Sequence, residues 1–468
     1  MKKYQPTIGL EIHAELKTAT KMFCDSPNNP DEKHPNVNVC PVCMGHPGCL
    51  PVMNKKAIES TIRVGLALGG KIAQVTKFDR KNYFYPDLPK GYQISQYDKP
   101  LVAGGELLGV RIRRVHLEED TGTLSHDEEG KSLVDFNRAG VPLMELVTEP
   151  DIESAEQAVA FAKELQRILR YLGVSDANME KGEMRVEVNI SMNMGTKVEI
   201  KNINSFKAVE GAVAKEIERQ TKLLEKGDGD KIKQETRGWD DVEKTTFSQR
   251  SKESAHEYRY FPEPDLPAFK TAGFDLLKLE RELPELPEAR CARFASEYGL
   301  SGAQADLLVD DEALADYYEE AASELKEKTD KPDNILLYNY LASDLAGLMK
   351  KEGLGVGEIK IPPEHLAHLV SMIVENKITS RQAKDALSEM FRGGEDAETL
   401  LKGKESIGGD ALESAIAETV NENPKAVLDY KNGKTASLQF LVGQVMKKTK
   451  GAAKPDELSA LLKKKLEK

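Results

Sequence analysis

Two carboxylates and one imidazole alternate with apolar residues near the start of the chain. Glu11, His13 and Glu15 each lie two positions apart within residues 8–16. This two-residue period predicts a β-strand with one buried face and one polar face. Carboxylates beside an imidazole can bind a metal ion or exchange protons with a substrate. An exposed polar face of a sheet is the alternative interpretation of this strand taken alone.

Further carboxylates follow other segments with a strand-like pattern. Glu118 and Glu119 end an apolar and basic segment, and Glu145 and Glu149 share one parity in the apolar segment 141–149. Buried carboxylates need partners, so convergence of several on one cation explains the pattern economically. An oxygen-rich set with a histidine suits Mg²⁺ and nucleotide phosphates better than Zn²⁺.

Four of the five cysteines lie between residues 24 and 49. Cys40 and Cys43 have the spacing that lets two thiolates take adjacent corners of a tetrahedral zinc ion. Cys24 lies upstream of this pair, and three residues could complete the ligand set, namely Cys49, His34 or His46. The alternatives are a redox pair or simply buried thiols, but the surrounding sequence lacks a thioredoxin-like pattern.

The glycine-rich loops that commonly bind nucleotide phosphates do not occur in this sequence. If ATP binds, Arg138 and the ionic face of a predicted hairpin over 184–201 are the candidates to meet its phosphates. That face carries Arg185 and Lys201. Alternatively, these two side chains pair with Glu187 and Glu199 across the strands.

The net charge of −12 over 468 residues is distributed unevenly. Residues 281–331 carry a net charge of −8, whereas residues 441–468 carry eight lysines against three acids. On a small helical module, such a basic end can contact a nucleic-acid backbone. A solvated lysine-rich terminus is the alternative.

Two kinds of architecture must position these residues. Up to about residue 280, short alternating segments surround one amphipathic helix over 151–172, with Asp151 as its expected N-cap. Beyond a proline-stiffened connection the periodicity becomes helical, with one stripe over 364–376 and an N-cap at Thr379 or Ser380 for the next helix.

This pattern predicts an α+β fold with three domains. They are a β-rich N-terminal domain over 1–285, an all-α helical domain over 286–400 and a small α-helical tail domain over 401–468. There is no run of 18 apolar residues and no apolar segment after the basic start, so we expect neither a membrane span nor a signal peptide. A cytoplasmic, reducing environment is expected from the cysteine usage.

Seven segments of the chain resemble the motifs of one family. They are GLEIHAEL at 9–16, HLEEDTG at 116–122, DFNRAGVPL at 135–143, TEPD at 148–151, VEIKNINSFK at 198–207, YRYFPEPDLP at 258–267 and GQVMK at 443–447. Together they resemble the GatB family, which provides the B subunit of the tRNA-dependent amidotransferases. The resemblance extends over essentially the whole chain.

The resemblance implies an ATP-dependent carbon–nitrogen ligase that uses glutamine as amide donor. Such an enzyme phosphorylates the side-chain carboxylate of Glu on tRNA(Gln) or of Asp on tRNA(Asn), and ammonia then displaces the phosphate. The A subunit of these enzymes, an amidase, supplies the ammonia, and a small C subunit holds the other two together. The alternative is a non-catalytic, tRNA-binding scaffold within the same complex.

The resemblance also assigns residues to a kinase-like cradle with Mg²⁺ and to a YqeY-like tail that contacts tRNA. The expected magnesium ligands are Glu11, His13, Glu118, Glu119 and Glu149, of which Glu11, His13 and Glu119 are also expected to be catalytic. Arg138, Lys201 and Tyr83 are expected at the nucleotide or substrate. Zinc would be held in the knuckle 24–49 by Cys24, Cys40, Cys43 and Cys49. Its fourth ligand stays open because Ser26 stands where zinc-bearing members have a cysteine.

Overall fold

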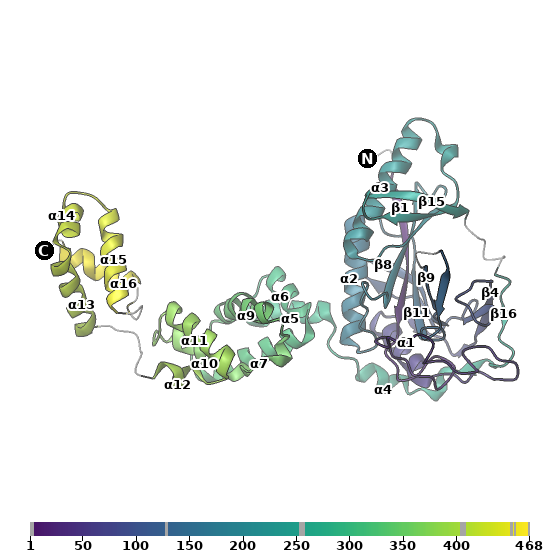
Figure 1. Ribbon diagram of the computed structural model, residues 1–468, viewed down its shortest axis with the longest axis horizontal. Helices are drawn as coiled ribbons and strands as arrows, with labels where there is room; N and C mark the ends of the chain where they lie inside the picture. The colour runs from purple at the N-terminus through teal and green to yellow at the C-terminus, as the bar shows by residue number, and fades with distance from the viewer. Residues whose placement is uncertain are drawn as a thin grey trace. The chain divides into compact units, whose positions relative to one another are not determined.

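The computed structural model describes residues 4–126, 130–251, 258–402, 409–449, 453 and 455–466. The chain divides into two compact units, residues 1–287 and 288–468 (Figure 1). The first unit is rich in β-sheet and the second is helical, which confirms the predicted order of the two architectures. Within the described ranges, no helix combines the length and the apolar character that crossing a membrane requires.

A mixed ten-stranded sheet forms the centre of the first unit. Its strands follow the order β15-β14-β13-β12-β1-β11-β8-β6-β2, with β7 paired to β8. Only the β13–β14 pair is parallel among the described pairs of this sheet. The strands are β1 (Pro6–Glu15), β2 (Lys71–Ile72), β6 (Val102–Ala103), β7 (Glu106–Leu107), β8 (Val110–Glu119), β11 (Pro142–Thr148), β12 (Met184–Met192), β13 (Val198–Lys201), β14 (Glu235–Asp240) and β15 (Thr245–Ser251).

Three helices cover the apolar face of this sheet, and these are α1 (Lys55–Ala67), α2 (Ala155–Tyr171) and α3 (Phe206–Glu225). Ile8, Leu10 and Ile12 of β1 are buried in one core with Phe161 of α2 and Val209 of α3. Figure 1 shows α2 and α3 along one side of the sheet. Because side chains alternate along a strand, the intervening residues of β1 project from the opposite face.

Short strands occupy the side of the sheet opposite α2 and α3 (Figure 1). They form three small sheets, β16-β4-β5, β10-β9 and β17-β3. Their bounds are β3 (Val75–Thr76), β4 (Asp79–Asn82), β5 (Tyr92–Ser95), β9 (Thr123–His126), β10 (Ser132–Asp135), β16 (Phe261–Pro262) and β17 (Phe269–Lys270). One consequence is that the polar face of the large sheet receives side chains from β4.

The predicted helix over 151–172 forms, but it starts later than expected. Ser154 is the N-cap of α2, and its Oγ accepts a hydrogen bond from the backbone N–H of Gln157 at 3.2 Å. Asp151 is not the cap, because its carboxylate is engaged by the Arg111 guanidinium at 2.7 Å. Gly173 follows the helix with a left-handed φ of 62°, as expected for a helix stop.

The helical unit consists of two successive groups of helices. The first is α5 (Pro287–Tyr298), α6 (Gly302–Val309), α7 (Glu312–Lys328), α8 (Asn334–Asn339), a π-helical segment Tyr340–Leu345, α9 (Ala346–Glu352), α10 (Pro363–Val374), α11 (Ser380–Gly393) and α12 (Ala397–Leu401). The second is α13 (Gly409–Glu422), α14 (Pro424–Lys431), α15 (Ala436–Lys448) and α16 (Pro455–Leu466). The predicted N-cap of α11 is confirmed at Thr379.

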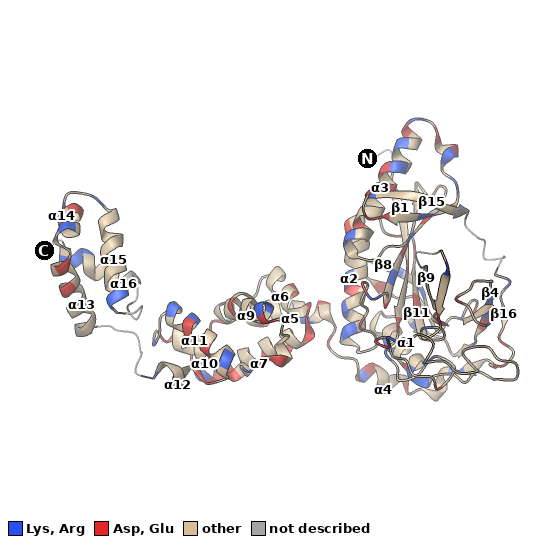
Figure 2. Ribbon diagram, viewed as in Figure 1, with Lys and Arg blue, Asp and Glu red and all other residues tan. Residues whose placement is uncertain are grey.

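The last four helices have a hydrophobic core of their own, which includes Leu412, Leu441, Val445 and Leu458. Figure 2 shows acidic and basic residues distributed along these helices among residues of other kinds. Lys448 pairs with Glu418 and Glu422, each at 2.8 Å, so it is not a free cation. Lys450, Lys454 and Lys468 of the predicted basic patch lie outside the described residues.

Candidate active site

The polar face of the large sheet places one histidine of β1 among charged residues of three neighbouring strands. His13 lies directly opposite Glu145 of β11 and Arg185 of β12, and Glu145 in turn lies opposite His116 of β8. Residues that are directly opposite in an antiparallel pair project from the same face. The register therefore builds a continuous row of ionisable side chains.

A cluster of two imidazoles and two carboxylates occupies the middle of this row. His13 Nε2 lies 3.4 Å from Glu145 Oε2 and 3.6 Å from Glu118 Oε1, while His116 Nε2 lies 3.5 Å from Glu145 Oε2. Glu118 and Glu145 are only 2% and 3% exposed. We call His13, His116, Glu118 and Glu145 the central cluster.

The central cluster and Glu11 have the spacing of metal ligands. One ligand atom from each of Glu11, His13 and Glu145 lies within 4.8 Å of the others, and the same holds for His116, Glu118 and Glu145. Glu145 belongs to both groups. Oxygen-rich donor sets of this kind suit a hard divalent cation such as Mg²⁺.

Electrostatics in the central cluster also favour a cation. Burial opposes protonation of His13, but the hydrogen bond and charge of Glu145, together with the charge of Glu118, raise its pKa to about 9. Burial alone would raise the pKa of Glu145, yet the charge of His116 and the interactions with His13 hold it well below its usual value. A bound metal would replace the proton on His13, because a ligating imidazole is neutral.

Glu11 is less strongly ionised than Glu145. Burial, followed by the charges of Glu145 and Glu187, raises the pKa of Glu11 to about 7. Glu11 can therefore take up a proton near neutral pH, and a cation bound nearby would favour the release of that proton.

Two lysines border the central cluster. Lys81 of β4 places its Nζ 3.9 Å from Glu118 Oε2, and Lys201 of β13 places its Nζ 2.8 Å from Glu187 Oε2. Burial opposes the charged form of each lysine, but neighbouring carboxylates outweigh it and raise both pKa values. Both side chains remain cationic, and Lys201 pairs across the strands as one of the two sequence interpretations predicted.

Arg185 and Arg138 converge on Asp120, whereas the sequence offered Glu187 or Glu199 as the alternative partner of Arg185. Arg185 donates to Asp120 Oδ2 at 2.7 Å, and Arg138 Nε lies 3.5 Å from the same oxygen. Burial would raise the pKa of Asp120, but the charges of Arg185 and Arg138 lower it to about 2. Burial, with the nearby Asp120 charge, raises the pKa of Glu15 to about 8.

An open cleft of about 710 Å³ adjoins the central cluster through Lys81. It contains two of the predicted nucleotide- or substrate-binding residues, Tyr83 and Lys201. Its full lining is Lys81, Tyr83, Phe84, Tyr85, Asp87, Lys201, Thr236, Gln249 and Tyr258. The volume lies in the range of clefts that bind small organic ligands.

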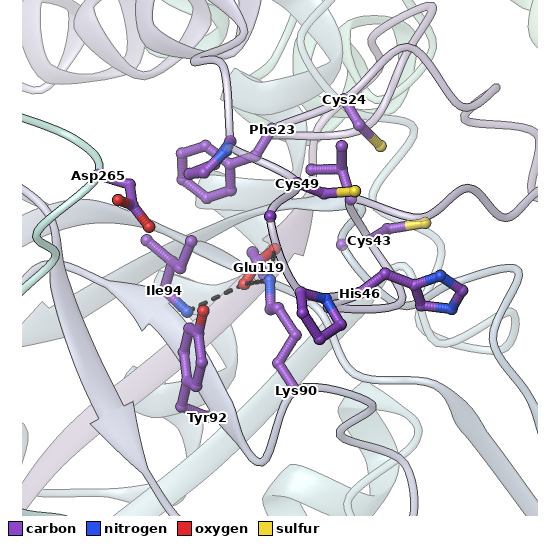
Figure 3. A pocket seen from close by; sticks show the side chains of 16 residues that line it. Phe23, Cys24, Cys43, His46, Cys49, Lys90, Tyr92, Ile94, Glu119 and Asp265 are labelled. Atoms are coloured by element: carbon purple, nitrogen blue, oxygen red, sulfur yellow. Dashed lines mark hydrogen bonds and ion pairs between the residues drawn. The ribbon is translucent and has the colours of Figure 1, made fainter.

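Glu119 does not join the other predicted magnesium ligands. It is adjacent to Glu118 in β8 and therefore projects from the opposite face. Its carboxylate accepts hydrogen bonds from Lys90 Nζ at 2.5 and 2.6 Å and from the backbone N–H of Ile94 at 3.0 Å. Figure 3 shows Lys90 and Glu119 meeting in the wall of a cavity of about 200 Å³.

Glu149 also lies apart from the central cluster. It follows the end of β11, where the register shifts between Val147 and Thr148. Its side chain is 28% exposed and pairs with Arg113 at 2.7 Å. Of the five residues that the sequence assigned to magnesium, only Glu11, His13 and Glu118 thus lie together.

Three of the predicted zinc ligands lie together, and two of them, Cys24 and Cys43, line the same cavity. The Sγ atoms of Cys24, Cys40 and Cys43 lie within 4.8 Å of one another. Cys49 is exposed and is not part of this group, although it lines the cavity (Figure 3). His34, a predicted alternative ligand, is bonded to Glu32 at 2.9 Å instead.

Two further residues complete the surroundings of Cys43. Ser26 Oγ and the buried Lys21 Nζ each lie 3.8 Å from its Sγ. A hydrogen bond from Cys24, the backbone N–H of Cys40 and the charge of Lys21 outweigh burial and lower the pKa of Cys43 to about 4. A thiolate among thiols is the donor chemistry of a zinc site, with Ser26 standing where a fourth sulfur would be.

Four residues of the site are not among those assigned individual roles from the sequence. Glu145 counts among the carboxylates expected to converge on a cation but not among the assigned ligands, and His116, Lys81 and Asp120 are not singled out as ligands or clamps. His116 and Glu118 repeat the two-residue spacing of Glu11 and His13, which could have indicated a second histidine on this face. Lys81 gives no comparable signal, because its strand reaches the site only through tertiary folding.

Comparisons with known proteins agree with this architecture. A model of the GatB/GatE catalytic domain matches residues 6–273, and a GatB domain model matches residues 316–466. These matches define a protein with an amidotransferase catalytic domain followed by a helical GatB domain. The chain belongs to the GatB family, as its motifs predicted.

Curated relatives match over nearly their whole length. The chain is 46% identical to the B subunit of the aspartyl/glutamyl-tRNA(Asn/Gln) amidotransferase of Thermodesulfovibrio yellowstonii, with 98% of both chains covered. It is 44% identical to proteins of the same name from Carboxydothermus hydrogenoformans, with all of both chains covered, and from Thermomicrobium roseum, with 99% of both covered.

Proposed function

We propose that this chain is the B subunit of a tRNA-dependent amidotransferase that activates the side chain of Glu on tRNA(Gln), of Asp on tRNA(Asn), or of both. The observation that carries this proposal is the central cluster beside an open cleft with two lysines. A scaffold that only binds tRNA has no need for buried carboxylates and imidazoles on a sheet face. The central cluster therefore favours the enzyme over the scaffold.

The proposed reaction has two steps. An oxygen of the aminoacyl side-chain carboxylate attacks the γ-phosphorus of ATP, and ADP leaves, which gives an acyl phosphate. Ammonia then attacks the carbonyl carbon, phosphate leaves and a proton is lost, which gives the amide. Catalysis of the first step requires mainly positioning and neutralisation of the phosphate charge.

The residues of the sheet face fit these requirements. Glu11, His13, Glu118 and Glu145 would hold Mg²⁺, which supplies charge neutralisation at the transferring phosphoryl group. Lys81 and Lys201 bring ammonium groups to the cleft wall, where they can bind phosphate oxygens. Arg138 is a weaker candidate for this role, because it lies beside Asp120.

The cysteine group is proposed to hold structural zinc through Cys24, Cys40 and Cys43. Ser26 or a water molecule is proposed as the fourth ligand in place of Cys49. Zinc analysis of purified wild type and Cys43→Ser tests this assignment: the variant should contain about one zinc ion fewer per chain, and equal contents would exclude it.

The remaining assignments follow the family. The ammonia would come from glutamine hydrolysed by the amidase, which is the A subunit, in a cytoplasmic heterotrimer completed by a small C subunit. The lysine-rich end of the chain would contact the tRNA backbone, so deleting residues beyond about 400 should weaken tRNA binding and reduce its dependence on salt. An unchanged salt dependence would exclude that contact.

The decisive experiment is a transamidation assay with the A and C subunits present and with each mischarged tRNA in turn. Wild type should form Gln-tRNA(Gln), Asn-tRNA(Asn) or both in an ATP-dependent reaction. His13→Ala should abolish the product while tRNA binding survives. Glu149→Gln is the matched control and should behave as wild type, because its carboxylate lies in an exposed pair. Activity of His13→Ala within twofold of wild type would favour the scaffold.

A further inference from the structure

A second group of metal-ligating side chains lies in the helical unit. His365 and His368 are one turn apart on α10 and therefore lie on one face of that helix. Asp396 immediately precedes α12, and Glu398 lies in its first turn. None of these four residues belongs to the sheet unit that carries the proposed amide chemistry.

The four side chains converge on Asp396 and His368. His368 Nδ1 lies 3.0 Å from Asp396 Oδ1, and His368 Nε2 lies 3.9 Å from Glu398 Oε2. His365 Nε2 lies 4.0 Å from Asp396 Oδ2. One ligand atom from each of His368, Asp396 and Glu398 lies within 4.8 Å of the others.

The charges of these carboxylates are not neutralised by the usual cations. In the part of the chain that the structure describes, the ion pairs of Asp396 and Glu398 are with histidines only. Some other carboxylates of the same unit pair with a lysine or an arginine, as Asp344 does with Lys384 at 2.7 Å and Glu319 with Arg293 at 2.6 Å. With neutral imidazoles, the group carries two negative charges that a divalent cation would balance.

We propose that His365, His368, Asp396 and Glu398 form a zinc site that ties α12 to α10. Donors about 2.1 Å from a tetrahedral Zn²⁺ stand about 3.4 Å apart. This separation lies between the 3.0 Å from His368 Nδ1 to Asp396 Oδ1 and the 4.0 Å from His365 Nε2 to Asp396 Oδ2. Two imidazoles among four donors favour Zn²⁺, whereas the proposed magnesium ligands are three carboxylates and one imidazole, because Mg²⁺ prefers oxygen. The three side chains other than Glu398 are 25–27% exposed, so the ion can enter from solvent.

The site would stabilise a helix that is too short to be stable alone. The helix α12 has five residues, of which Ala397 and Leu401 are buried. Asp396 already orients its first turn, because its Oδ1 accepts the backbone N–H of Glu398 at 2.8 Å. An ion bound to Asp396 and Glu398 would hold the start of α12 against the two histidines of α10.

The test is a zinc titration of the full chain against a chromophoric chelator, in saturating Mg²⁺. Wild type should bind one zinc ion more than the double variant His365→Asn/His368→Asn. The Kd of that additional ion should be below about 10 µM. Both proteins retain the cysteine group, so the difference reports the new site alone. Asp344→Asn is the matched control, because it removes a carboxylate of the same unit outside the cluster and should bind as wild type.

A second variant guards against misfolding of the double variant. Glu398→Gln changes a side chain that is 77% exposed, so the fold should not be affected. It should weaken binding of the additional zinc ion about tenfold or more. Equal zinc stoichiometry and affinity in wild type and all variants would overturn the proposal, as would additional binding seen only at millimolar zinc.

Discussion

At its C-terminal end, β8 carries one buried carboxylate on each face. The two carboxylates differ in how closely positively charged groups approach them. Glu118 faces the central cluster, where its neighbours include His13 at 3.6 Å and Lys81 at 3.9 Å. Glu119 faces the cavity beside the cysteine group, where Lys90 meets it at 2.5 Å and a backbone N–H at 3.0 Å. Glu118 accepts a neutral hydrogen bond from Ser95 Oγ at 3.0 Å, but its cationic partners are distant and shared, whereas Glu119 has a close ammonium partner of its own.

This difference distinguishes a site from a structural pair. A carboxylate that already accepts close hydrogen bonds from an ammonium group has little to offer a metal ion. The two acids of the central cluster have histidine partners at 3.4–3.6 Å, which leaves room for a cation between them. This contrast supports placing the proposed phosphoryl chemistry on the face of β8 that carries Glu118, whereas the other face carries a buried ion pair.

The largest expected effect is the loss of catalysis when the shared member of the central cluster changes. Glu145→Gln should reduce the ATP-dependent rate by about a thousandfold or more, because Glu145 belongs to both ligand groups. Rate measurements at saturating Mg²⁺ check this prediction. A loss of less than tenfold would show that the cluster does not carry the reaction.

The next effect concerns stability rather than catalysis. Glu119→Gln should destabilise the fold by about 2–4 kcal/mol, because it leaves the Lys90 ammonium, which is 10% exposed, without its charged partner. Denaturant unfolding of the sheet unit within the full chain measures the change. The double variant Lys90→Met/Glu119→Gln should recover part of the lost stability. Absence of any recovery would show that the loss does not arise from the unpaired charge of Lys90.

Another effect on stability should appear in its pH dependence. The pKa of Glu15 is about 8 in the folded chain against an ordinary 4.5, so the folded state retains a proton that the unfolded state releases. Stability should therefore decline as pH rises from about 4.5 to about 8. Glu15→Gln should flatten this decline and raise stability at pH 8, whereas Glu243→Gln, on an exposed turn, should leave it unchanged. An equal slope in both variants would contradict the assignment.

The smallest effect is expected for the acid that only the sequence placed at the metal. Glu149→Gln removes an exposed pair with Arg113, so unfolding free energy should change by about 1 kcal/mol or less. Catalytic rates should stay within twofold of wild type. A large loss of activity would show that Glu149 belongs to the active site. It would also weaken the contrast between the two faces of β8.

Much of the fold was predictable because local patterns and tertiary structure agree. The alternation in Ile8–Leu16 predicts β1, and the hairpin over 184–201 pairs as β12 and β13. The helical stripe at 364–376 and the Thr379 cap also form as predicted. Asp151 failed as a cap because Arg111, 40 positions away, binds it, and sequence distance conceals that competition.

The candidate site was predictable only within single strands. The alternation of side chains along a strand correctly places Glu11 and His13 on one face. The same rule separates Glu118 from Glu119, although the resemblance to the family grouped these two residues together. Lys81 depends on the packing of a small sheet against the large one, and no local pattern carries that information. The register shift at Val147/Thr148 likewise removes Glu149 from the face that parity assigned to it.

Single-turnover ADP formation tests the central claim most directly. The reaction contains ATP, Mg²⁺, mischarged tRNA and the A and C subunits, but neither glutamine nor ammonia, so it isolates the phosphoryl transfer. We expect Glu119→Gln to form ADP within tenfold of the wild-type rate and Glu145→Gln to form none above background. Equal losses in the two variants, or ADP formation by Glu145→Gln near the wild-type rate, would contradict the assignment of the chemistry to the central cluster.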